Sequence, residues 1–398
     1  MLWGPHMGIL NERRRRVYPW LLLVALWSVF ALNVALHHGW RGGLGQIVGI
    51  DFVVFYTGGL FSARDPAHLY DFATQLDAQR RLLAPTALAG SGPFSNPPFA
   101  APVFGLFSRI PLFWAFVLWS AIQLLCVALA IELAVRFLVP EERRKAGFER
   151  LRLAVLVLSS YPWIEGFAAG QLHGLVLLAV TAVSIASLRR RDAVAGICAA
   201  TLLFKPQFAV GFLAIWLVGR RWRALAAFAA GAAAWVLATL PSVGTGAYIG
   251  YLHTLPQLLR LPYTPGWPRA LMTTPYGLLA AALPPVEAQT AATAIGVFSV
   301  LLLVWLALKA REPHVLAAAV VLPFLATPYA LCHDLVVLAP ALLLLDRAAI
   351  ERPALETLAE FCYAAPLVLA IAGIATHLAL PALVPIAAGA CIFKWRAG

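Results

Sequence analysis

The chain has 398 residues, of which 62% are hydrophobic and only 12% are charged. Soluble globular domains carry roughly 45–50% apolar and about 25% charged residues. So few charges do not cover a water-facing surface, and the mean hydropathy of +0.82 leads to the same conclusion. The composition therefore excludes a soluble fold and predicts an all-α protein that crosses the membrane many times.

The formal net charge is +12, which in a soluble domain would suggest a nucleic-acid partner. Here the basic residues form short clusters beside apolar segments, as the positive-inside rule requires. We therefore expect membrane lipids, and no nucleic acid, as partners. The five Cys residues show no CxxC spacing and lie mostly in apolar runs. They are expected to be buried apolar side chains, and neither a metal nor a cofactor is expected.

Apolar segments of about the length needed to cross the hydrocarbon recur along the chain. The first follows the basic cluster Arg13–Arg16 and lacks a small-residue cleavage site, so a retained membrane helix is expected rather than a signal peptide. The predicted spans are 17–36, 112–138, 152–169, 172–188, 223–241, 287–308, 315–331, 334–346, 357–376 and 379–393. Together with a hairpin at 193–218, they give about eleven or twelve helical passes in a single domain, 1–398.

The hairpin is predicted because Lys205-Pro206 interrupts the apolar segment 193–218. Each half holds about 12 residues, or some 18 Å of helix, which is too short to cross, so the segment is expected to enter and leave on one side. Lys205 at its tip is costly unless it lines water or meets an anion. We expect it to face a cavity and bind a phosphate; the alternative is a side chain that extends to the membrane interface.

The basic residues predict the orientation of the spans. Of the 30 Lys and Arg residues, 22 fall on one side when the spans are threaded in order. They are Arg13–Arg16, Arg136, Arg143, Arg144, Lys145, Arg150, Arg152, Arg189–Arg191, Arg220, Arg221, Arg223, Lys309, Arg311, Arg347, Arg352, Lys394 and Arg396. By the positive-inside rule this side, with the N-terminus, is cytoplasmic. We expect an inner (plasma) membrane protein whose functional site faces the periplasm or the exterior.

Two loops on the outer side are long. In the first, 37–111, Asp65-Pro66 is typical of a helix start, and Leu69, Phe72, Leu76 and Leu83 recur on one helical face. This pattern predicts an amphipathic helix that lies on the membrane surface. The second outer loop, 242–286, is rich in Pro, Gly and aromatic residues.

Three carboxylates on the outer side are candidates for chemistry. Asp51 stands alone among apolar and aromatic residues, where burial would raise its pKa and make it a general base; the alternative is a helix N-cap. Glu165, at the turn of a tight hairpin, is expected to be a solvated loop acid. Asp334 either caps a helix or, with His333 beside it at the membrane edge, contacts a phosphate or sugar.

Gln171 and His173 occur at the outer end of a predicted helix pair. They either point into a polar cavity, where they would recognise hydroxyl groups, or pack at the membrane interface. The sequence contains no Walker loop, dinucleotide fingerprint, catalytic Ser/His/Asp pattern or metal-type His/Cys spacing.

Six features in this order resemble glycosyltransferase family 87, membrane enzymes of the GT-C class that use polyprenyl-phosphate sugars. They are Asp51-Phe52 with Tyr56, Leu69-Tyr70-Asp71, Phe94-Ser95-Asn96-Pro97-Pro98, Gly170-Gln171, Lys205-Pro206-Gln207 and His333-Asp334, which together cover about residues 17–346. The resemblance implies transfer of a sugar, such as mannose or arabinofuranose, from a polyprenyl-phosphate donor to a lipid or glycan acceptor.

The resemblance also implies that Asp51 is the catalytic base, which takes the proton of the acceptor hydroxyl while the anomeric configuration inverts. The donor and acceptor site would further contain Tyr56, Gln171, His173, Lys205, His333 and Asp334. On physical grounds we expect Lys205 and His333 to contact the donor phosphate, since a positive pocket stabilises that leaving group. Ser95-Asn96 departs from the usual family pattern, which bears on the identity of the donor or acceptor.

Two other functions are compatible with a multi-pass chain. A transporter or lipid flippase would place charged residues in the middle of its helices and show repeated halves, and no such repeat is evident. A non-catalytic partner in glycan assembly would be suggested by loss of the acid in the first loop, and Asp51 is present. The pattern therefore favours an enzyme.

Overall fold

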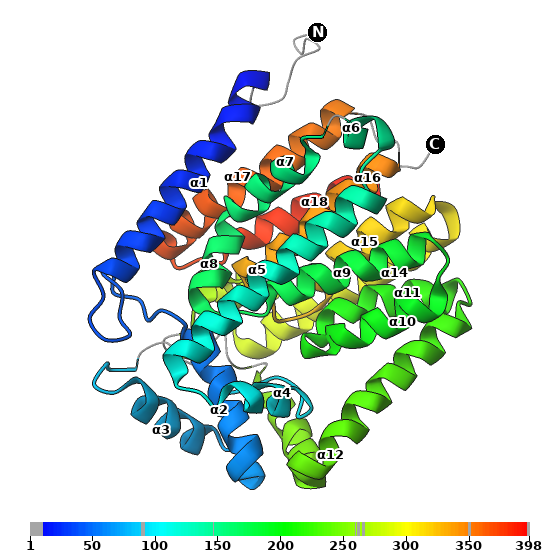
Figure 1. The fold of residues 1–398 in the computed structure, drawn as a ribbon. Coiled ribbons are helices and arrows are strands. Elements are labelled where there is room, and N and C mark those ends of the chain that lie inside the picture. Colours follow the sequence, from blue (N-terminus) through cyan, green and yellow to red (C-terminus); the bar gives the residue numbers. More distant parts are fainter. Residues whose placement is uncertain are drawn as a thin grey trace.

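The computed structural model describes residues 11–88, 92–145, 147–258, 260, 263–264, 267–348 and 352–395. Its regular structure is helical (Figure 1), and no β-strand forms within these ranges. The prediction of an all-α membrane protein is confirmed, because several of the helices are apolar and long enough to span a bilayer.

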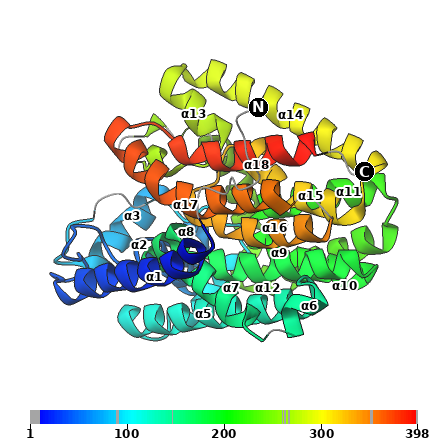
Figure 2. The same ribbon diagram turned by 90° about the horizontal axis from the view of Figure 1, so that it is seen from above.

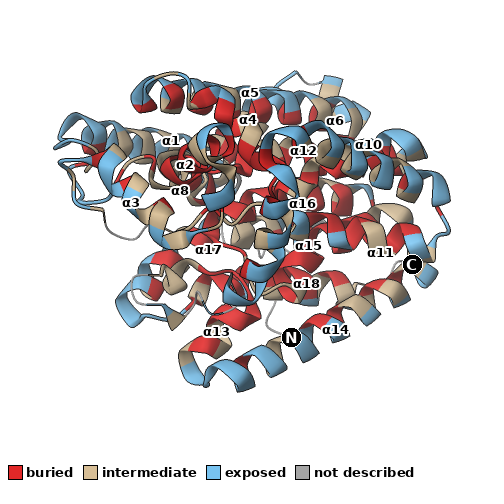
Figure 3. Cartoon of the chain, turned by 90° about the horizontal axis from the view of Figure 1, so that it is seen from below, coloured by how far each residue is buried: buried red, intermediate tan, exposed pale blue. Residues whose placement is uncertain are grey.

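Five helices in the described ranges are long and apolar enough to cross a membrane alone. They are α1 (Glu12–Ala35), α5 (Leu112–Phe137), α12 (Trp222–Leu258), α14 (Pro285–Lys309) and α17 (Arg352–Thr376). Large apolar side chains on their outer faces, such as Leu237 and Phe298, are exposed. Figure 3 shows this exposure along α12 and α14. Because contiguous apolar surface is unfavourable in water, these faces are expected to contact lipid.

Shorter helices fill the middle of the bundle, between α5 on one edge and α14 on the other (Figure 2). Two of them, α9 (His173–Leu188) and α15 (Glu312–Ala326), are buried along most of their length. Helix α15 has 15 residues and is therefore about 22 Å long, less than the roughly 30 Å of hydrocarbon. A helix enclosed by others does not need to reach both membrane surfaces, so several predicted passes are shorter than expected.

The remaining short helices complete the bundle. They are α7 (Glu149–Leu158), α8 (Tyr161–Ala169), α10 (Asp192–Thr201), α11 (Val210–Val218), α16 (Leu338–Arg347), which follows the 3-10 turn Cys332–Val337, and α18 (Leu383–Lys394). The single span predicted at 152–169 is wrong in one respect, because it consists of two helices. The second begins at Tyr161 with Pro162 in its first turn, where a missing backbone N–H costs nothing.

Ion pairs join the basic turns into one face of the molecule. Arg221 pairs with Asp192 and, at 2.9 Å, with Glu312, so the α9–α10, α11–α12 and α14–α15 turns meet there. Arg143 of α6 (Glu141–Lys145) pairs with Asp346 at the end of α16, at 2.8 Å. The beginning of α1 and the end of α18 lie on the same side of the bundle (Figure 1). We call this the basic face; the grouping of its loops agrees with the sorting of charge along the sequence.

The segment 193–218 folds back on itself. Helix α10 and helix α11 are joined by two 3-10 turns, Leu202–Phe204 and Pro206–Ala209, with Lys205 between them. The Arg221–Asp192 pair holds the two open ends of this hairpin together on the basic face. Lys205 therefore lies at the far end, inside the bundle.

The first outer loop contains three helices, α2 (Ile50–Arg64), α3 (Phe72–Leu83) and α4 (Ala100–Phe107). The expected start of the surface helix at Asp65 is wrong. Asp65 pairs with His68 at 2.7 Å and precedes a single 3-10 turn, whereas Asp71 accepts the N–H groups of Ala73 and Thr74 and caps α3. An Asp bonded to the N2 and N3 amides satisfies donors that a helix start leaves free.

The buried face of α3 also differs from the apolar stripe predicted for it. Gln75 and Gln79 are fully buried, together with Leu83. The Gln75 Oε1 atom accepts the backbone N–H of Phe94 at 2.6 Å. The helix is thus fastened by amide hydrogen bonds to the extended segment around Ser95-Asn96, which borders the cavity described below.

Reporter fusions test the orientation. A periplasmic reporter fused after Thr245, near the kink of α12 at Gly244, is expected to be active, and one fused after Lys145 on the basic face to be silent. Enzymatic activity of both reporters in intact cells measures this directly, with equal expression as the control. The reverse pattern would overturn the orientation.

Candidate active site

A cavity of about 1280 Å³ opens away from the basic face. Polar side chains in its wall include Asp51, Glu165, Gln171, Lys205 and His333. They come from five separate parts of the chain: α2, α8, the α8–α9 turn, the hairpin tip and the turn before α16. The rest of the wall is largely apolar and includes residues of α1, α12 and α17.

The backbone at the start of α2 positions Asp51. Gly49 adopts a left-handed conformation (φ 74°), which favours glycine, and its N–H donates to the carbonyl of Ala168 at 2.8 Å. This bond ties the beginning of α2 to the end of α8. The N-cap residue of α2 is Gly49, and Asp51 lies in the first helical turn. The N-cap alternative is therefore wrong, and Asp51 instead lines the cavity.

The end of α8 brings a second residue to Asp51. Helix α8 ends at Gly170 (φ 79°), where a Cβ atom would lie 2.6 Å from the Cβ of Phe52. Only glycine fits this left-handed position beside α2. The chain then turns so that Gln171 Nε2 donates to Asp51 Oδ2 at 2.7 Å. Two glycines thus place the amide and the carboxylate against each other.

The surroundings of Asp51 suit a general base. Burial raises the pKa of its carboxyl group above the ordinary value, while the Gln171 hydrogen bond and the positive charge of Lys205 act to lower that pKa. The partial positive charge at the beginning of α2 also favours the ionised form. A carboxylate of raised basicity that is still supported as an anion is able to accept a proton from a hydroxyl group.

A second polar cluster surrounds Lys205. Its Nζ atom donates to Asp334 Oδ1 at 2.6 Å and to His333 Nε2 at 3.2 Å. His333 Nδ1 lies 2.9 Å from Glu165 Oε2. Because Nε2 accepts from the lysine, these contacts require the proton of a neutral His333 to be on Nδ1, where it donates to Glu165. Lysine, histidine and two carboxylates therefore form one hydrogen-bonded row, of which Glu165, His333 and Lys205 line the cavity.

These contacts define the positions of three side chains for which the sequence predicts or allows a different location. The Lys205 side chain is 9% exposed and ion-paired, so it does not extend to the membrane interface. Asp334 accepts the backbone N–H of Leu331 at 3.1 Å and also pairs with Lys205, so it supports its own turn and the cluster together. Glu165 borders the cavity and contacts His333 rather than solvent alone, so its assignment as a solvated loop acid is wrong.

Sequence reasoning missed several cavity residues besides Glu165. Tyr329 and Gln207 line the cavity, and Gln207 Nε2 donates to the Tyr329 carbonyl at 3.3 Å. Asn96 donates to the carbonyl of Phe204 at 2.8 Å and so ties the first outer loop to the hairpin. Asn96 and Gln207 belong to motifs that resemble the family, and this resemblance is the feature of the sequence that could have identified them. Tyr329, in Thr327-Pro328-Tyr329, has no comparable feature in the sequence apart from its position four residues before His333.

Three predicted site residues, Tyr56, His173 and Asp334, do not line the cavity, and Asp334 is connected to it through Lys205. Tyr56 is buried, and its hydroxyl donates to the carbonyl of Ile110 at 2.9 Å. His173 is fully buried with its ring centroid 4.4 Å from that of Trp163, and neither ring nitrogen has a hydrogen-bond partner in the described part of the chain. His173 lies next to His333, with 6.5 Å between ring centroids. Its contacts support the cluster from behind.

Among the residues that the structure describes, no group of three or more His, Cys, Asp or Glu side chains is arranged to hold a metal ion. The five cysteines are all unpaired, and two of them, Cys126 and Cys332, are buried.

The family model of glycosyltransferase family 87 matches residues 94–332, which include Gln171, Lys205 and Glu165. The chain belongs to this family. It is thus a membrane glycosyltransferase, with donor and acceptor substrates. The match begins after Asp51 and ends one residue before His333. No curated protein and no solved structure matches the chain.

The Asp51–Gln171 hydrogen bond predicts a change in pH dependence. A base works in its ionised form, so activity is present above the pKa of Asp51 and lost as the pH falls through it. Because Gln171 lowers that pKa, Gln171→Leu is expected to move the acidic limb of the pH–kcat/KM profile to higher pH. Gln207→Leu, which removes a cavity glutamine that does not contact Asp51, is the control. An unmoved limb in Gln171→Leu would mean that another group titrates.

Proposed function

We propose that this glycosyltransferase moves a sugar, a hexose such as mannose or a pentose, from a polyprenyl-phosphate donor to a lipid or glycan hydroxyl. The single observation that carries the proposal is the position of Asp51. Its carboxylate is held by Gln171 in the wall of a cavity that also contains a lysine and a histidine. A base and a cationic group in one cavity are what this transfer needs.

In the proposed reaction, Asp51 accepts the proton of the acceptor hydroxyl as that oxygen attacks the anomeric carbon. The bond between this carbon and the phosphate oxygen breaks, its electron pair leaves with the polyprenyl phosphate, and the configuration at the carbon inverts. Asp51 ends protonated and returns the proton to solvent through the cavity. Every bond formed is thus matched by one broken, and the phosphate leaves as an anion.

Lys205 is the group we assign to that phosphate. An ammonium group has three N–H donors, and Asp334 and His333 take two of them. The third is available to a phosphate oxygen. His333, Gln171 and Asp334 position Lys205 and Asp51 in this scheme, with Glu165 fixing the tautomer of His333. Tyr56 and His173 then act through packing behind the cavity wall.

The apolar part of the cavity supports a lipid-linked donor. Leu26 and Val29 of α1 and Leu367 and Ile374 of α17 line it, and Val29 and Ile374 are also exposed on the outside of the bundle. The cavity wall thus continues into surface that is expected to contact lipid. A long isoprenoid chain would lie along this surface while its phosphate reaches Lys205.

The position of the cavity also supports a proposal for the side of the membrane on which the reaction takes place. It lies opposite the basic face, and the basic face is cytoplasmic by the positive-inside rule. The reaction is therefore proposed to occur on the periplasmic or exterior side of the plasma membrane. A transporter or flippase, the alternative function, would need charged groups along a path between both faces. The described acidic and basic groups of the cavity instead gather at one end of the short central helices.

Transfer of radiolabelled mannose from polyprenyl-phosphate mannose in membranes tests the proposal. Asp51→Asn is expected to lower kcat by roughly 10²–10⁴-fold, since the amide does not accept the proton. Asp77→Asn, which makes the same change at an exposed carboxylate of α3 outside the cavity, serves as the control at equal expression. Full activity in Asp51→Asn would remove Asp51 as the base and move attention to Glu165. No transfer by the wild type would reopen the donor and favour the transporter function.

The role of Lys205 is tested with a single and a double variant, because removal of Lys205 alone leaves the buried charge of Asp334 without a counter-charge. Breaking such a pair on one side costs about 3–5 kcal/mol, so Lys205→Met alone is expected to lower the melting temperature. The double variant Lys205→Met, Asp334→Asn is expected to recover stability. Its Kd for polyprenyl-phosphate mannose should still rise about tenfold or more, since a charge-assisted hydrogen bond is lost. A Kd equal to that of the wild type would make Lys205 purely structural.

A further inference from the structure

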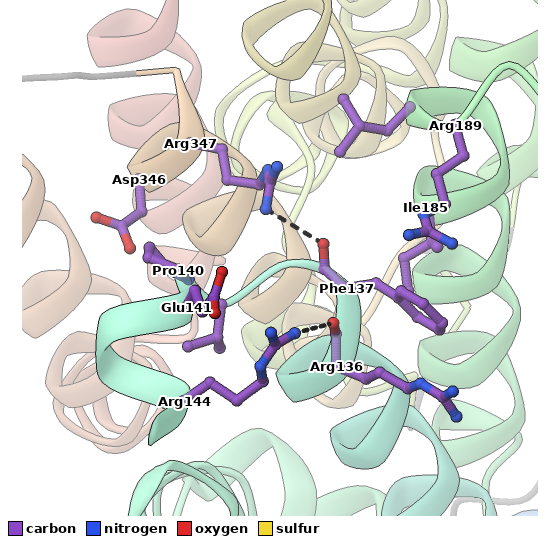
Figure 4. A pocket seen from close by; sticks show the side chains of 11 residues that line it. Arg136, Phe137, Pro140, Glu141, Arg144, Ile185, Arg189, Asp346 and Arg347 are labelled. Carbon is purple, nitrogen blue, oxygen red and sulfur yellow. Dashed lines mark hydrogen bonds between the residues drawn. The ribbon is translucent and has the colours of Figure 1, made fainter. Parts of the chain in front are cut away.

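A second cavity, of about 600 Å³, opens on the basic face, at the opposite end of the molecule from Asp51. Four arginines from four helix ends line it: Arg136 of α5, Arg144 of α6, Arg189 after α9 and Arg347 of α16 (Figure 4). Ligand pockets in proteins measure about 300–1,000 Å³, so its size is ordinary for a binding site. We call this cavity the arginine pocket.

The carboxylates of the arginine pocket are already paired with cations that do not line it. Glu141 pairs with Lys145 at 2.8 Å, and Asp346 pairs with Arg143 at 2.8 Å. Glu132, one turn before Arg136, pairs instead with Arg150 at 2.6 Å. Within the described residues, none of the four arginines of the pocket forms an ion pair with a carboxylate. No carboxylate of the described residues therefore contacts these four guanidinium groups directly, and Arg136 has only the longer-range attraction of Glu132.

Two of the four guanidinium groups support the end of α5. Arg144 Nη1 donates to the Arg136 carbonyl at 2.9 Å, and Arg347 Nη1 donates to the Phe137 carbonyl at 3.3 Å, as Figure 4 shows. These bonds satisfy carbonyls that a helix end leaves free. A guanidinium has five N–H donors, so most donors of Arg144 and Arg347 remain available.

The guanidinium groups of the other two arginines, Arg136 and Arg189, lie beside an aromatic ring. Their Cζ atoms lie 5.3 and 4.4 Å from the centroid of the Phe137 ring. Neither guanidinium donates a hydrogen bond to any residue the structure describes. Stacking on an aromatic ring orders an arginine without using its donors, which is an arrangement suited to binding phosphate through two parallel hydrogen bonds.

We propose that the arginine pocket binds a phosphate group, namely the headgroup phosphate of an anionic phospholipid in the adjacent leaflet. The surface of α5 favours a lipid as the source. Leu125 and Leu129 are 58% and 47% exposed. Leu129 lies two helical turns, or about 10 Å, before Arg136 on the same side of α5. A lipid whose acyl chains follow these leucines would present its phosphate to the pocket.

The test uses the purified full-length protein in neutral detergent, with bound lipids counted by native mass spectrometry. Phosphatidylglycerol is expected to bind the wild type in preference to phosphatidylcholine. Arg136→Gln, Arg189→Gln removes the two arginines that donate no hydrogen bond in the structure. It is expected to weaken phosphatidylglycerol binding about thirtyfold and to leave phosphatidylcholine unchanged, since each of the two basic residues contributes roughly 1 kcal/mol toward an anionic lipid.

Two further variants keep the test independent of folding and of general charge. Arg14→Gln, Arg223→Gln removes the same charge from the basic face outside the pocket and is expected to bind phosphatidylglycerol like the wild type. Arg136→Lys, Arg189→Lys keeps the charge and the membrane orientation but loses paired hydrogen bonding. It is expected to bind phosphatidylglycerol more weakly than the wild type and more tightly than the glutamine variant.

Inorganic phosphate distinguishes the two sources of the ligand. If phosphate raises the melting temperature of the wild type but not of Arg136→Gln, Arg189→Gln, while lipid binding is equal in both, the pocket takes a soluble phosphate. If the pocket variant and the Arg14→Gln, Arg223→Gln control behave alike with both lipid and phosphate, the proposal is overturned. Sugar transfer is a separate readout, because the arginine pocket and the cavity around Asp51 lie at opposite ends.

Discussion

The fold depends on finding a counter-charge for Lys205, which an apolar bundle otherwise does not tolerate at the tip of a hairpin. Asp334 supplies this charge at 2.6 Å, and His333 and Glu165 extend the contact into a row. An unpaired ion in such surroundings costs several kcal/mol. The hairpin of α10 and α11 is thus fixed to the turn before α16, and the wall of the cavity is built from the same interaction.

The lengths of the helices explain how a polar cavity exists within the bundle. Helix α14 has 25 residues and is about 37 Å long, whereas α15 has 15 residues and is about 22 Å long. Helix α9 begins at His173, α15 ends at Ala326, and the hairpin turns at Lys205, so all three stop near the cavity. The long outer helices enclose the space that the short ones leave open. Backbone groups at these ends meet polar side chains or the cavity rather than lipid.

The two ends of the molecule use charge in different ways. At the cavity, the carboxylates Asp51, Glu165 and Asp334 are held by hydrogen bonds from Gln171, His333 and Lys205. On the basic face, arginines outnumber carboxylates, and those of the arginine pocket keep most of their donors free. The first arrangement suits proton transfer from an acceptor and departure of a phosphate. The second suits a stationary anion and the orientation of the chain in the membrane.

Much of this protein was determined by its sequence alone. Low charge and long apolar segments dictate a helical membrane protein, because only helices satisfy every backbone group in hydrocarbon without a partner strand. The ordered motifs indicated the family, and Asp51 and Lys205 stood out because isolated charges are costly in apolar surroundings. Local rules were less reliable where two candidates competed, as with Asp65 and Asp71 for the start of α3.

Only the tertiary structure decided which polar groups meet. Asp51 and Gln171 are 120 residues apart, and Lys205 and Asp334 are 129 apart. Such pairings depend on the packing of whole helices, on which local spacing carries no information. The same limit explains why the sequence predicts a solvated acid at Glu165, which contacts His333 instead. It also explains why Tyr56, His173 and Asp334 do not line the cavity that the sequence predicts for them. The neighbours of a side chain on other helices, and not its own segment, determine whether it lines the site, positions another site residue or only packs in the interior.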